Sequence, residues 1–272
     1  MQYDPIKKSL GIVFNKTPFM RVLFYRLLDM LLLRTWHVKK AIRKWGKDRE
    51  ANQQILDAGS GFGQYSYFLS GINPSWIIKA VDVKEEQIED CNVFFAKTGR
   101  TNVRFNVADL TTFCKPKTFD LILSVDVMEH ILEDEQVFRN FFDSLTDEGM
   151  LLISTPSDKG GSDVHDQNEE SSFIEEHVRD GYNIEEIQEK LKRAGFSKTE
   201  AHYTYGKPGQ LGWRLSMKYP IQMLNTSKIF FILLPFYYLI TFPVALICNW
   251  MDVRGKHNTG TGLIVKAWKL TK

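Results

Sequence analysis

The sequence predicts a doubly wound α/β fold, in which helices cover both faces of a mostly parallel sheet. Short, nearly continuous apolar runs alternate along the chain with segments that are long enough to form helices. Such runs are typical of parallel strands, because these strands are buried on both faces. A glycine-rich turn follows the first run, and it indicates that a ligand binds where that strand ends.

The expected strands and helices follow one another in a regular order. Five apolar runs predict the first five strands, and two later runs predict a sixth and a seventh, at 55–57, 77–83, 103–110, 119–126, 149–156, 196–205 and 262–269. The segments between them predict helices at 65–70, 85–98, 133–145 and 184–194. Ligands of open α/β sheets bind beyond the carboxyl ends of the strands, so the residues that end these runs are the first candidates for a site.

The glycine-rich turn reads Asp57-Ala-Gly-Ser-Gly-Phe-Gly63. A dinucleotide-binding turn has the spacing Gly-x-Gly-x-x-Gly, whereas here the third glycine comes one residue early and Gln64 follows it. The acidic Asp57 would repel a pyrophosphate but suits the ammonium group of an amino acid. An ordinary strand-to-helix turn that binds nothing is the simplest alternative.

The order of these motifs across roughly residues 50–200 resembles the class I methyltransferases that use S-adenosylmethionine (SAM). The similarity is greatest to the small-molecule methyltransferases that carry a Glu-His pair after the fourth strand, here Glu129-His130. The resemblance implies a seven-stranded Rossmann-like sheet, with SAM as the cofactor. It implies that the methionine part, the ribose and the adenine of SAM are held by Asp57, Ala58, Gly59, Gly61, Gly63, Asp82, Val83, Asp109, Leu110 and Val125.

The catalytic candidates follow the fourth and fifth strands. An acceptor oxygen must lose a proton when it is methylated, and a histidine suits this role near neutral pH. His130 is therefore the first candidate base, although Glu129 and His130 could instead only hold their loop. His177 and Tyr182 are further candidates in a segment that covers the acceptor pocket in the resembled family. The polar loop 157–172 is expected to act as a mobile lid.

The residues Asp126, Glu129 and His130 also resemble the Glu-x-x-Glu-His triplet of the quinone O-methyltransferases of ubiquinone biosynthesis, which is associated with a divalent cation. Two carboxylates and an imidazole could hold Mg²⁺ with water ligands. Asp126 replaces the first Glu of that triplet. A helix start with acidic residues near its dipole is the favoured alternative.

The composition excludes some classes of partner. The net charge is only +2, and no basic stripe is interleaved with aromatic residues, so no nucleic-acid partner is expected. The cysteines Cys91, Cys114 and Cys248 have no paired spacing and are typical of reduced thiols in a cytosolic protein. The first residues lack the pattern of a signal peptide.

Residues 19–45 predict a helical region with an apolar stripe and, in its later part, basic residues. The simpler interpretation is a pair of helices that pack on the domain and partly cover the active site. The alternative is an amphipathic element that contacts an anionic membrane surface.

An uncharged segment at 229–248 has nearly the length of a membrane-spanning helix, which needs ~20 residues. Because the sixth and seventh strands on either side of it pair in one sheet, a single crossing would separate them by the bilayer. We therefore expect a hairpin, with residues 211–224 as its first arm and bends at Pro235 and Pro243, that lies on the membrane or re-enters it. A dimer interface and an extra core helix are the alternatives.

These observations divide the chain into an N-terminal helical cover (1–48), a SAM-binding core (49–206), an apolar insertion (207–258) and the last strand (259–272). The expected function is methyl transfer from SAM to a hydroxyl or carboxyl oxygen of a hydrophobic, lipid-like small molecule. The enzyme is expected to be cytoplasmic and bound peripherally or monotopically to the inner face of a membrane. A soluble metabolite, a quinone ring methylated with help from Mg²⁺, and a degenerate SAM-binding membrane scaffold are the alternatives.

Overall fold

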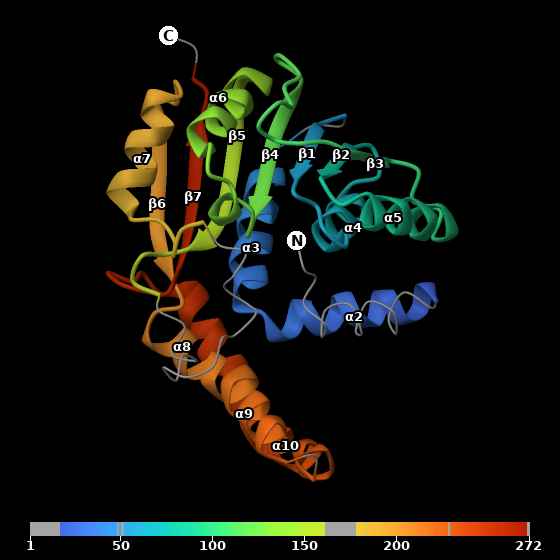
Figure 1. Ribbon diagram of the computed structural model, residues 1–272, viewed down its shortest axis with the longest axis vertical. Coiled ribbons are helices and arrows are strands. Elements are labelled where there is room, and N and C mark those ends of the chain that lie inside the picture. The colour runs from blue at the N-terminus through green and yellow to red at the C-terminus, as the bar shows by residue number, and fades with distance from the viewer. Residues whose placement is uncertain (1–16, 48, 50–51, 161–177, 228, 271–272) are drawn as a thin grey trace.

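The computed structural model describes residues 17–47, 49, 52–160, 178–227 and 229–270. They form one seven-stranded sheet with the order β3-β2-β1-β4-β5-β7-β6, flanked by helices (Figure 1). The strands are β1 (Gln54–Ala58), β2 (Ile77–Asp82), β3 (Val103–Val107), β4 (Phe119–Val125), β5 (Leu145–Pro156), β6 (Lys198–Thr204) and β7 (Gly262–Trp268). The first five are parallel and β7 is antiparallel to both of its neighbours. The predicted doubly wound, Rossmann-like sheet is confirmed.

Some element boundaries differ from the prediction. The third strand ends at Val107 instead of Leu110, because the chain turns there and Asp109 accepts hydrogen bonds from Thr111. The fifth strand begins four residues earlier than expected, at Leu145, where the preceding helix ends.

Helices cover the two faces of the sheet with separate apolar cores. On one face lie α3 (Leu33–Gly46), α4 (Gln64–Ile72) and α5 (Glu85–Lys97), which bury residues such as Ile42, Leu69 and Phe95. On the other face lie α6 (Asp134–Ser144) and α7 (Ile184–Arg193), which bury Phe138 and Leu191. The carboxyl ends of the parallel strands form the edge of the sheet at which ligands of such folds bind.

The N-terminal helices α2 (Pro18–Leu31) and α3 meet at Leu32, and α2 crosses below the carboxyl ends of the strands (Figure 1). Arg21 of α2 is buried and donates to the carbonyl oxygens of Phe62 and Asp90, at 2.9 and 3.2 Å. These bonds attach α2 to the glycine-rich turn and to α5. The N-terminal helices thus pack on the domain next to the glycine-rich turn.

A helical hairpin leaves the body between β6 and β7 (Figure 1). Its first arm comprises α8 (Lys207–Trp213), a π-helical turn (Arg214–Lys218) and α9 (Tyr219–Thr226), and its second arm is α10 (Phe230–Arg254). Among the described residues, α10 alone has the length and composition of a helix that could cross a membrane, with a mean hydropathy of 2.2 in its most apolar window. It continues as one helix through Pro235 and Pro243, the two positions where the sequence predicts bends.

A buried carboxylate attaches the hairpin to the body. Asp252 is fully buried and accepts hydrogen bonds from His37 Nε2 of α3 at 2.8 Å and from the backbone N–H groups of Tyr205 and Gly209 at 3.2 and 3.1 Å. His257 Nε2 lies 3.2 Å from its second oxygen. A Cβ atom at Gly209 would lie 2.6 Å from this carboxylate, so a glycine is needed for the approach. We call these residues the Asp252 cluster.

Candidate active site

The glycine-rich turn connects β1 to α4 at the carboxyl edge of the sheet. Gly59, Gly61 and Gly63 have φ angles of +78°, +48° and +75°, a region that other residues rarely adopt. A Cβ atom on Gly59 would overlap the side chain of Val127, whereas at Gly61 the nearest atom would be 3.9 Å away. The turn therefore packs tightly against the loop after β4 on one side and leaves open space above Gly61. This bare backbone can accept a ligand at van der Waals distance.

Asp57 is the last residue but one of β1 and lies beneath this turn. Its side chain is 3% exposed and accepts a hydrogen bond of 2.6 Å from Ser66 Oγ at the start of α4. Burial raises the pKa of Asp57 to about 6. Asp57 thus braces the turn against α4, and its predicted contact with the ammonium group of SAM stays a prediction. Ala58, its neighbour in the turn, is fully buried.

Asp82 links the ends of β1 and β2. Its Oδ2 atom accepts from the N–H of Gly61 at 2.9 Å, and Oδ1 accepts from the N–H of Lys84 at 3.0 Å. The carboxylate is half-buried and lies beside the glycine-rich turn, as a ribose-binding group must. The following residue, Val83, is exposed.

The structure places the remaining cofactor candidates along the same edge, in different surroundings. Asp109 is exposed after β3, and Val125 is half-buried at the end of β4. Leu110, in contrast, is only 5% exposed and its side chain belongs to the core over α6. Leu110 can therefore line an adenine site through its backbone more readily than through its side chain.

A polar cluster follows β4. Asp126 has a φ of +52° and pairs with the guanidinium of Arg34 from α3, whose backbone N–H donates to the hydroxyl of Tyr205 at 3.1 Å. Glu129 is 1% exposed and accepts from Thr155 Oγ1 at 3.1 Å. Burial, together with the nearby charge of Asp126, raises the pKa of Glu129 to about 8. Arg34 and Tyr205 thus bring the N-terminal helices and the base of the hairpin to the site.

His130 ends the short 3₁₀ helix Met128–His130 and is exposed, so an acceptor can approach its ring. The Mg²⁺ set of Asp126, Glu129 and His130, the less favoured interpretation of these residues, gains no support from the structure. Among the described residues, no three His, Cys, Asp or Glu side chains are grouped so that they could hold a metal ion. The Asp126 carboxylate is instead neutralised by Arg34.

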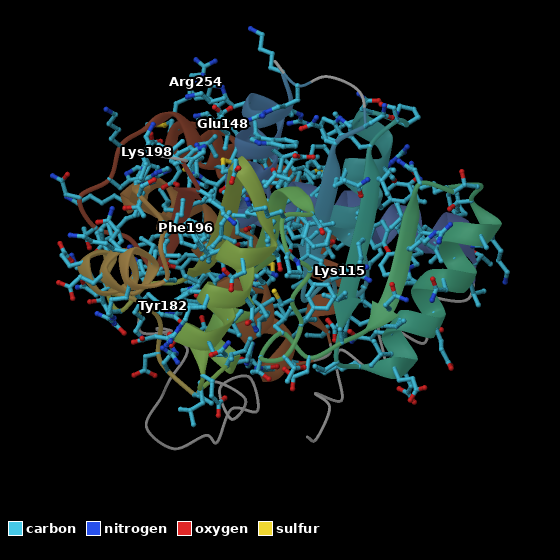
Figure 2. All side chains as sticks on the ribbon, turned by 90° about the horizontal axis from the view of Figure 1, so that it is seen from above. Lys115, Glu148, Tyr182, Phe196, Lys198 and Arg254 are labelled. Carbon is cyan, nitrogen blue, oxygen red and sulfur yellow. The ribbon has the colours of Figure 1, made fainter. Side chains whose placement is uncertain are left out.

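Tyr182 does not lie where the sequence analysis placed it. It is fully buried, and its hydroxyl lies 2.7 Å from Asp134 Oδ2 and 3.2 Å from the carbonyl oxygen of Met128. Figure 2 labels Tyr182 and Phe196, two members of the core beside α6 and α7. The side chain joins the 3₁₀ helix to α6 from within this core, so the structure does not support a direct role in catalysis. His177 and residues 161–172 of the predicted lid (157–172) lie outside the described residues.

Sequence reasoning missed Arg21, Arg34, Tyr65 and Tyr205. Tyr65, at the start of α4, has its hydroxyl 3.4 Å from that of Thr35, beside Arg34. The basic residues of α3 suggested only a solvated or membrane-facing stripe. No local pattern indicates that one of them pairs with a carboxylate 92 positions later.

Comparison with known proteins agrees with this geometry. A family model described as a methyltransferase domain matches residues 49–204. The chain belongs to the class I SAM-dependent methyltransferases. The matched range agrees with the strands and turns described above, and it ends before the hairpin.

Several curated methyltransferases are similar to this chain over part of their length. The phosphoethanolamine N-methyltransferase of Triticum aestivum is 31% identical over 150 residues, which are 55% of this chain and 29% of that protein. The malonyl-[acyl-carrier protein] O-methyltransferase of Bacillus anthracis is 32% identical over 114 residues, covering 41% of this chain and 40% of the relative. The chain thus spans less than half the length of these relatives.

Solved structures share the fold. Haemonchus contortus phosphoethanolamine N-methyltransferase 2, in complex with phosphomonomethylethanolamine and S-adenosylhomocysteine, has a TM-score of 0.60 at 19% identity, covering 87% of this chain and 53% of that one. A putative sarcosine dimethylglycine methyltransferase from Galdieria sulphuraria has a TM-score of 0.54 at 18% identity, with coverages of 87% and 84%. The chain therefore has the methyltransferase architecture over most of its length.

Proposed function

We propose that this protein transfers the methyl group of SAM to an oxygen of a hydrophobic small molecule, which reaches the active site from a membrane surface. The observation that carries the proposal is the apolar outer face of the hairpin. Its most apolar window in α10 is only 6% buried, and the residues that stand out most are Phe231, Ile232, Phe236, Leu239 and Ile240, each more than 60% exposed. An apolar surface of this size marks a site of interaction with a membrane or a protein.

On the inner face of the hairpin, side chains of the second arm form hydrogen bonds with the first arm. The hydroxyls of Tyr237 and Tyr238 donate to the carbonyl oxygens of Leu215 and Ser216 in the first arm, at 2.8 and 2.9 Å. The two arms are therefore held to each other, and the apolar residues that remain exposed point outwards. This supports an outer face that contacts the acyl region of a bilayer, as amphipathic interfacial elements do.

The position of the hairpin supports delivery of the acceptor from the membrane. It projects from the end of the molecule where the parallel strands have their carboxyl ends and where α2 lies (Figure 1). The hydroxyl of Tyr205, at the base of the hairpin, accepts a hydrogen bond from the backbone N–H of Arg34, whose guanidinium pairs with Asp126 of the polar cluster. A lipid-like acceptor that leaves the bilayer along the hairpin would meet the cofactor edge first.

Within this proposal the chain aligns the acceptor and removes its proton. SAM supplies a methyl carbon that its sulfonium activates for in-line displacement. The glycine-rich turn and Asp82 would hold the cofactor, and alignment of the two reactants can supply a large share of the rate. His130, exposed after β4, would take the proton from an acceptor hydroxyl. For a carboxylate acceptor no proton transfer is needed, and alignment alone would suffice.

Within the same proposal, the cysteines support a location in a reducing cellular compartment. Cys91, Cys114 and Cys248 are free thiols, which fits a reducing compartment. The membrane face would then be the inner, cytoplasmic one.

The test uses methyl-labelled SAM, the purified protein and a total cell extract, with partition between organic solvent and water. We expect label in the organic phase, and we expect its loss in the Asp57→Ala control. A triple variant with Phe231, Phe236 and Leu239 changed to Ser should still bind SAM but should no longer co-float with phospholipid vesicles. Label found only in the water phase would contradict the lipid-like acceptor, and co-flotation of the triple variant would contradict the membrane role of the hairpin.

A further inference from the structure

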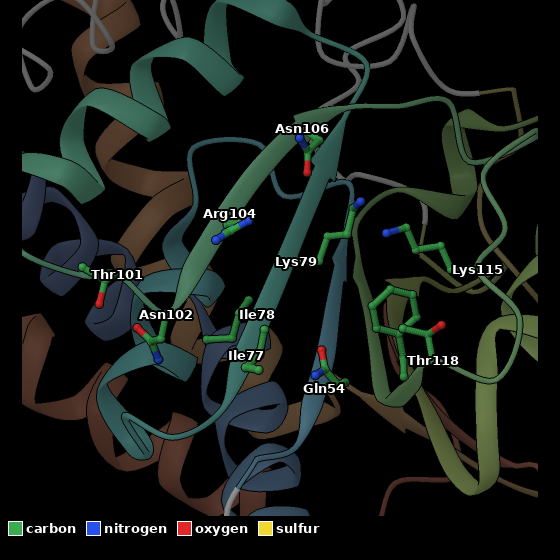
Figure 3. Close-up of a pocket in the computed structure, with 11 residues that line it drawn as sticks. Gln54, Ile77, Ile78, Lys79, Thr101, Asn102, Arg104, Asn106, Lys115 and Thr118 are labelled. Atoms are coloured by element: carbon green, nitrogen blue, oxygen red, sulfur yellow. The ribbon is translucent and has the colours of Figure 1, made fainter.

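A groove on the sheet, remote from the cofactor edge, has no role in the proposed methyl transfer. It has a volume of about 490 Å³ and is lined by Gln54, Ile77, Ile78, Lys79, Thr101, Asn102, Arg104, Asn106, Lys115, Thr118 and Phe119 (Figure 3). Most of these residues lie at or before the starts of β1, β2, β3 and β4. The groove therefore opens towards the amino ends of the strands.

The groove exists because one part of the sheet has no helical cover. On the face opposite α4 and α5, the core beneath α6 and α7 reaches β4, β5, the later residues of β1, and Val81 near the end of β2. The connection from β3 to β4, residues 108–118, contains no helix that could cover the remainder. The outward side chains of β2 and β3 on this face consequently meet the groove instead of a core.

The groove is lined by three cations and by no carboxylate. Lys79 of β2 and Arg104 of β3 are direct partners in the parallel register, so their side chains stand on the same face of the sheet. Like charges placed opposite each other on adjacent strands destabilise a sheet. The side chain of Lys115 points towards that of Lys79 from the β3–β4 connection (Figure 3).

No described carboxylate compensates these charges. Asp120, which follows the lining residue Phe119, accepts from the backbone N–H of Gln54 at 2.8 Å and from Thr146 Oγ1 at 3.0 Å. Burial, followed by the adjacent Lys115 ammonium, lowers the pKa of Lys79 to about 8. The two ammonium groups are thus neighbours in a groove whose lining has no carboxylate, and the Lys79 ammonium also lies 5.4 Å from the centroid of the Phe113 ring.

We propose that this groove binds a small, soluble phosphate-bearing ligand, with the phosphate between Lys79, Lys115 and Arg104. Ammonium and guanidinium groups bind phosphate through charge-assisted hydrogen bonds, and a guanidinium can do so with two parallel bonds. Asn106 and Asn102 supply neutral hydrogen-bonding groups, and Ile77 and Phe119 supply an apolar wall for the rest of the ligand. The volume lies within the range of small-molecule sites.

The location separates this ligand from both the cofactor and the membrane. The hairpin lies towards the carboxyl ends of the strands (Figure 1), as does the glycine-rich turn after β1, whereas most residues that line the groove lie towards the amino ends. A phosphate of a bilayer lipid is therefore the less suitable source. The site and the methyl-transfer site can be tested independently.

The experiment measures binding of pyrophosphate to the full chain by calorimetry at constant ionic strength, with sodium chloride as the balancing salt. We expect saturable binding that weakens at least tenfold in Lys115→Gln and in Arg104→Gln. Lys117→Gln is the matched control, since Lys117 is two residues from Lys115, lies outside the groove and is paired with Asp147. The proposal would be overturned if Lys117→Gln lost as much affinity as the other two variants. It would also be overturned if sodium chloride gave the same binding heats as pyrophosphate, because general charge screening would then explain the effect.

Four further readouts distinguish a binding site from a change in general surface charge. Without phosphate, Lys115→Gln should melt at the same temperature or up to about 3 °C higher, because it relieves repulsion with Lys79. Pyrophosphate should raise the pKa of Lys79, which can be followed by NMR of its ammonium group. Vesicles that contain phosphatidic acid should not compete with pyrophosphate, and competition that Lys115→Gln abolishes would assign the site to a lipid instead. Retained SAM binding in each variant would show that the fold is intact.

Discussion

Replacement of Asp252 by Ala should detach the hairpin from the body of the enzyme. The change leaves the N–H groups of Tyr205 and Gly209 and the ring of His37 without their acceptor in a fully buried place. An unsatisfied buried donor costs ~1–3 kcal/mol, and loss of one partner from a buried charged network costs ~3–5 kcal/mol. For a chain of this size, such a loss lowers the melting temperature by about 10 °C.

The assay is urea denaturation of the wild type, Asp252→Ala and Asp252→Asn, together with limited proteolysis. The asparagine keeps one acceptor oxygen, so about half of the loss should remain, and cleavage should begin within residues 207–258. Although burial opposes ionisation, the hydrogen bond from His37 and the charges of His257 and His37 lower the pKa of Asp252 from its ordinary value of 3.8. Its stabilising effect is thus complete above that value and is lost as the pH falls through the lower, folded-state pKa. An Asp252→Ala protein within about 1 kcal/mol of the wild type would refute this reasoning.

Three other substitutions test the candidate active site. Gly59→Ala should abolish SAM binding in calorimetry, because the new methyl group overlaps Val127 and φ is +78°, and measurable affinity near the wild-type value would contradict the tight turn. Asp82→Ala should raise the KM for SAM at least tenfold while kcat falls less, since it removes the acceptor for Gly61 N–H and for a ribose; a change in kcat alone would argue against it. The free energy of unfolding of the wild type should fall between about pH 4.5 and 8, and Glu129→Gln should not show this fall. Burial makes the ionised Glu129 unfavourable in the folded state, so the wild type is most stable below the unfolded pKa and loses this advantage as the pH rises through the folded one. Parallel stability curves from urea titrations at pH 5, 6.5 and 8 would exclude that role.

The sequence was sufficient to predict the sheet, because each parallel strand is a short apolar run that ends near a polar residue. The glycine-rich turn was equally clear, since three closely spaced glycines serve a backbone with positive φ angles. Strand ends were less certain. At the end of β3, the Asp109 turn interrupts an apolar pattern that continues to Leu110.

The surroundings of individual side chains could not be predicted in the same way. Tyr182 follows a group of polar residues in the sequence, yet Asp134 and Met128, 48 and 54 positions away, hold its hydroxyl in the core. Arg34 looks like one of several basic residues on a helix, and only the fold brings it to Asp126. Long-range pairing of this kind leaves no periodic trace in the chain.

The Asp252 cluster has a mechanical consequence. Thr204 and Gly262 are the last partners in the β6–β7 ladder. The chain between these two residues forms the hairpin. Without other contacts, a force on the hairpin would open this ladder one pair at a time, beginning at Thr204 and Gly262. Asp252 provides such a contact, because it joins the C-terminal end of α10 to Tyr205 and, through His37, to α3. Force applied to the hairpin is thus shared between the end of the ladder and the helical layer. These contacts restrain the hairpin relative to the body, so a hairpin held by a bilayer would limit the directions in which the cofactor edge can face.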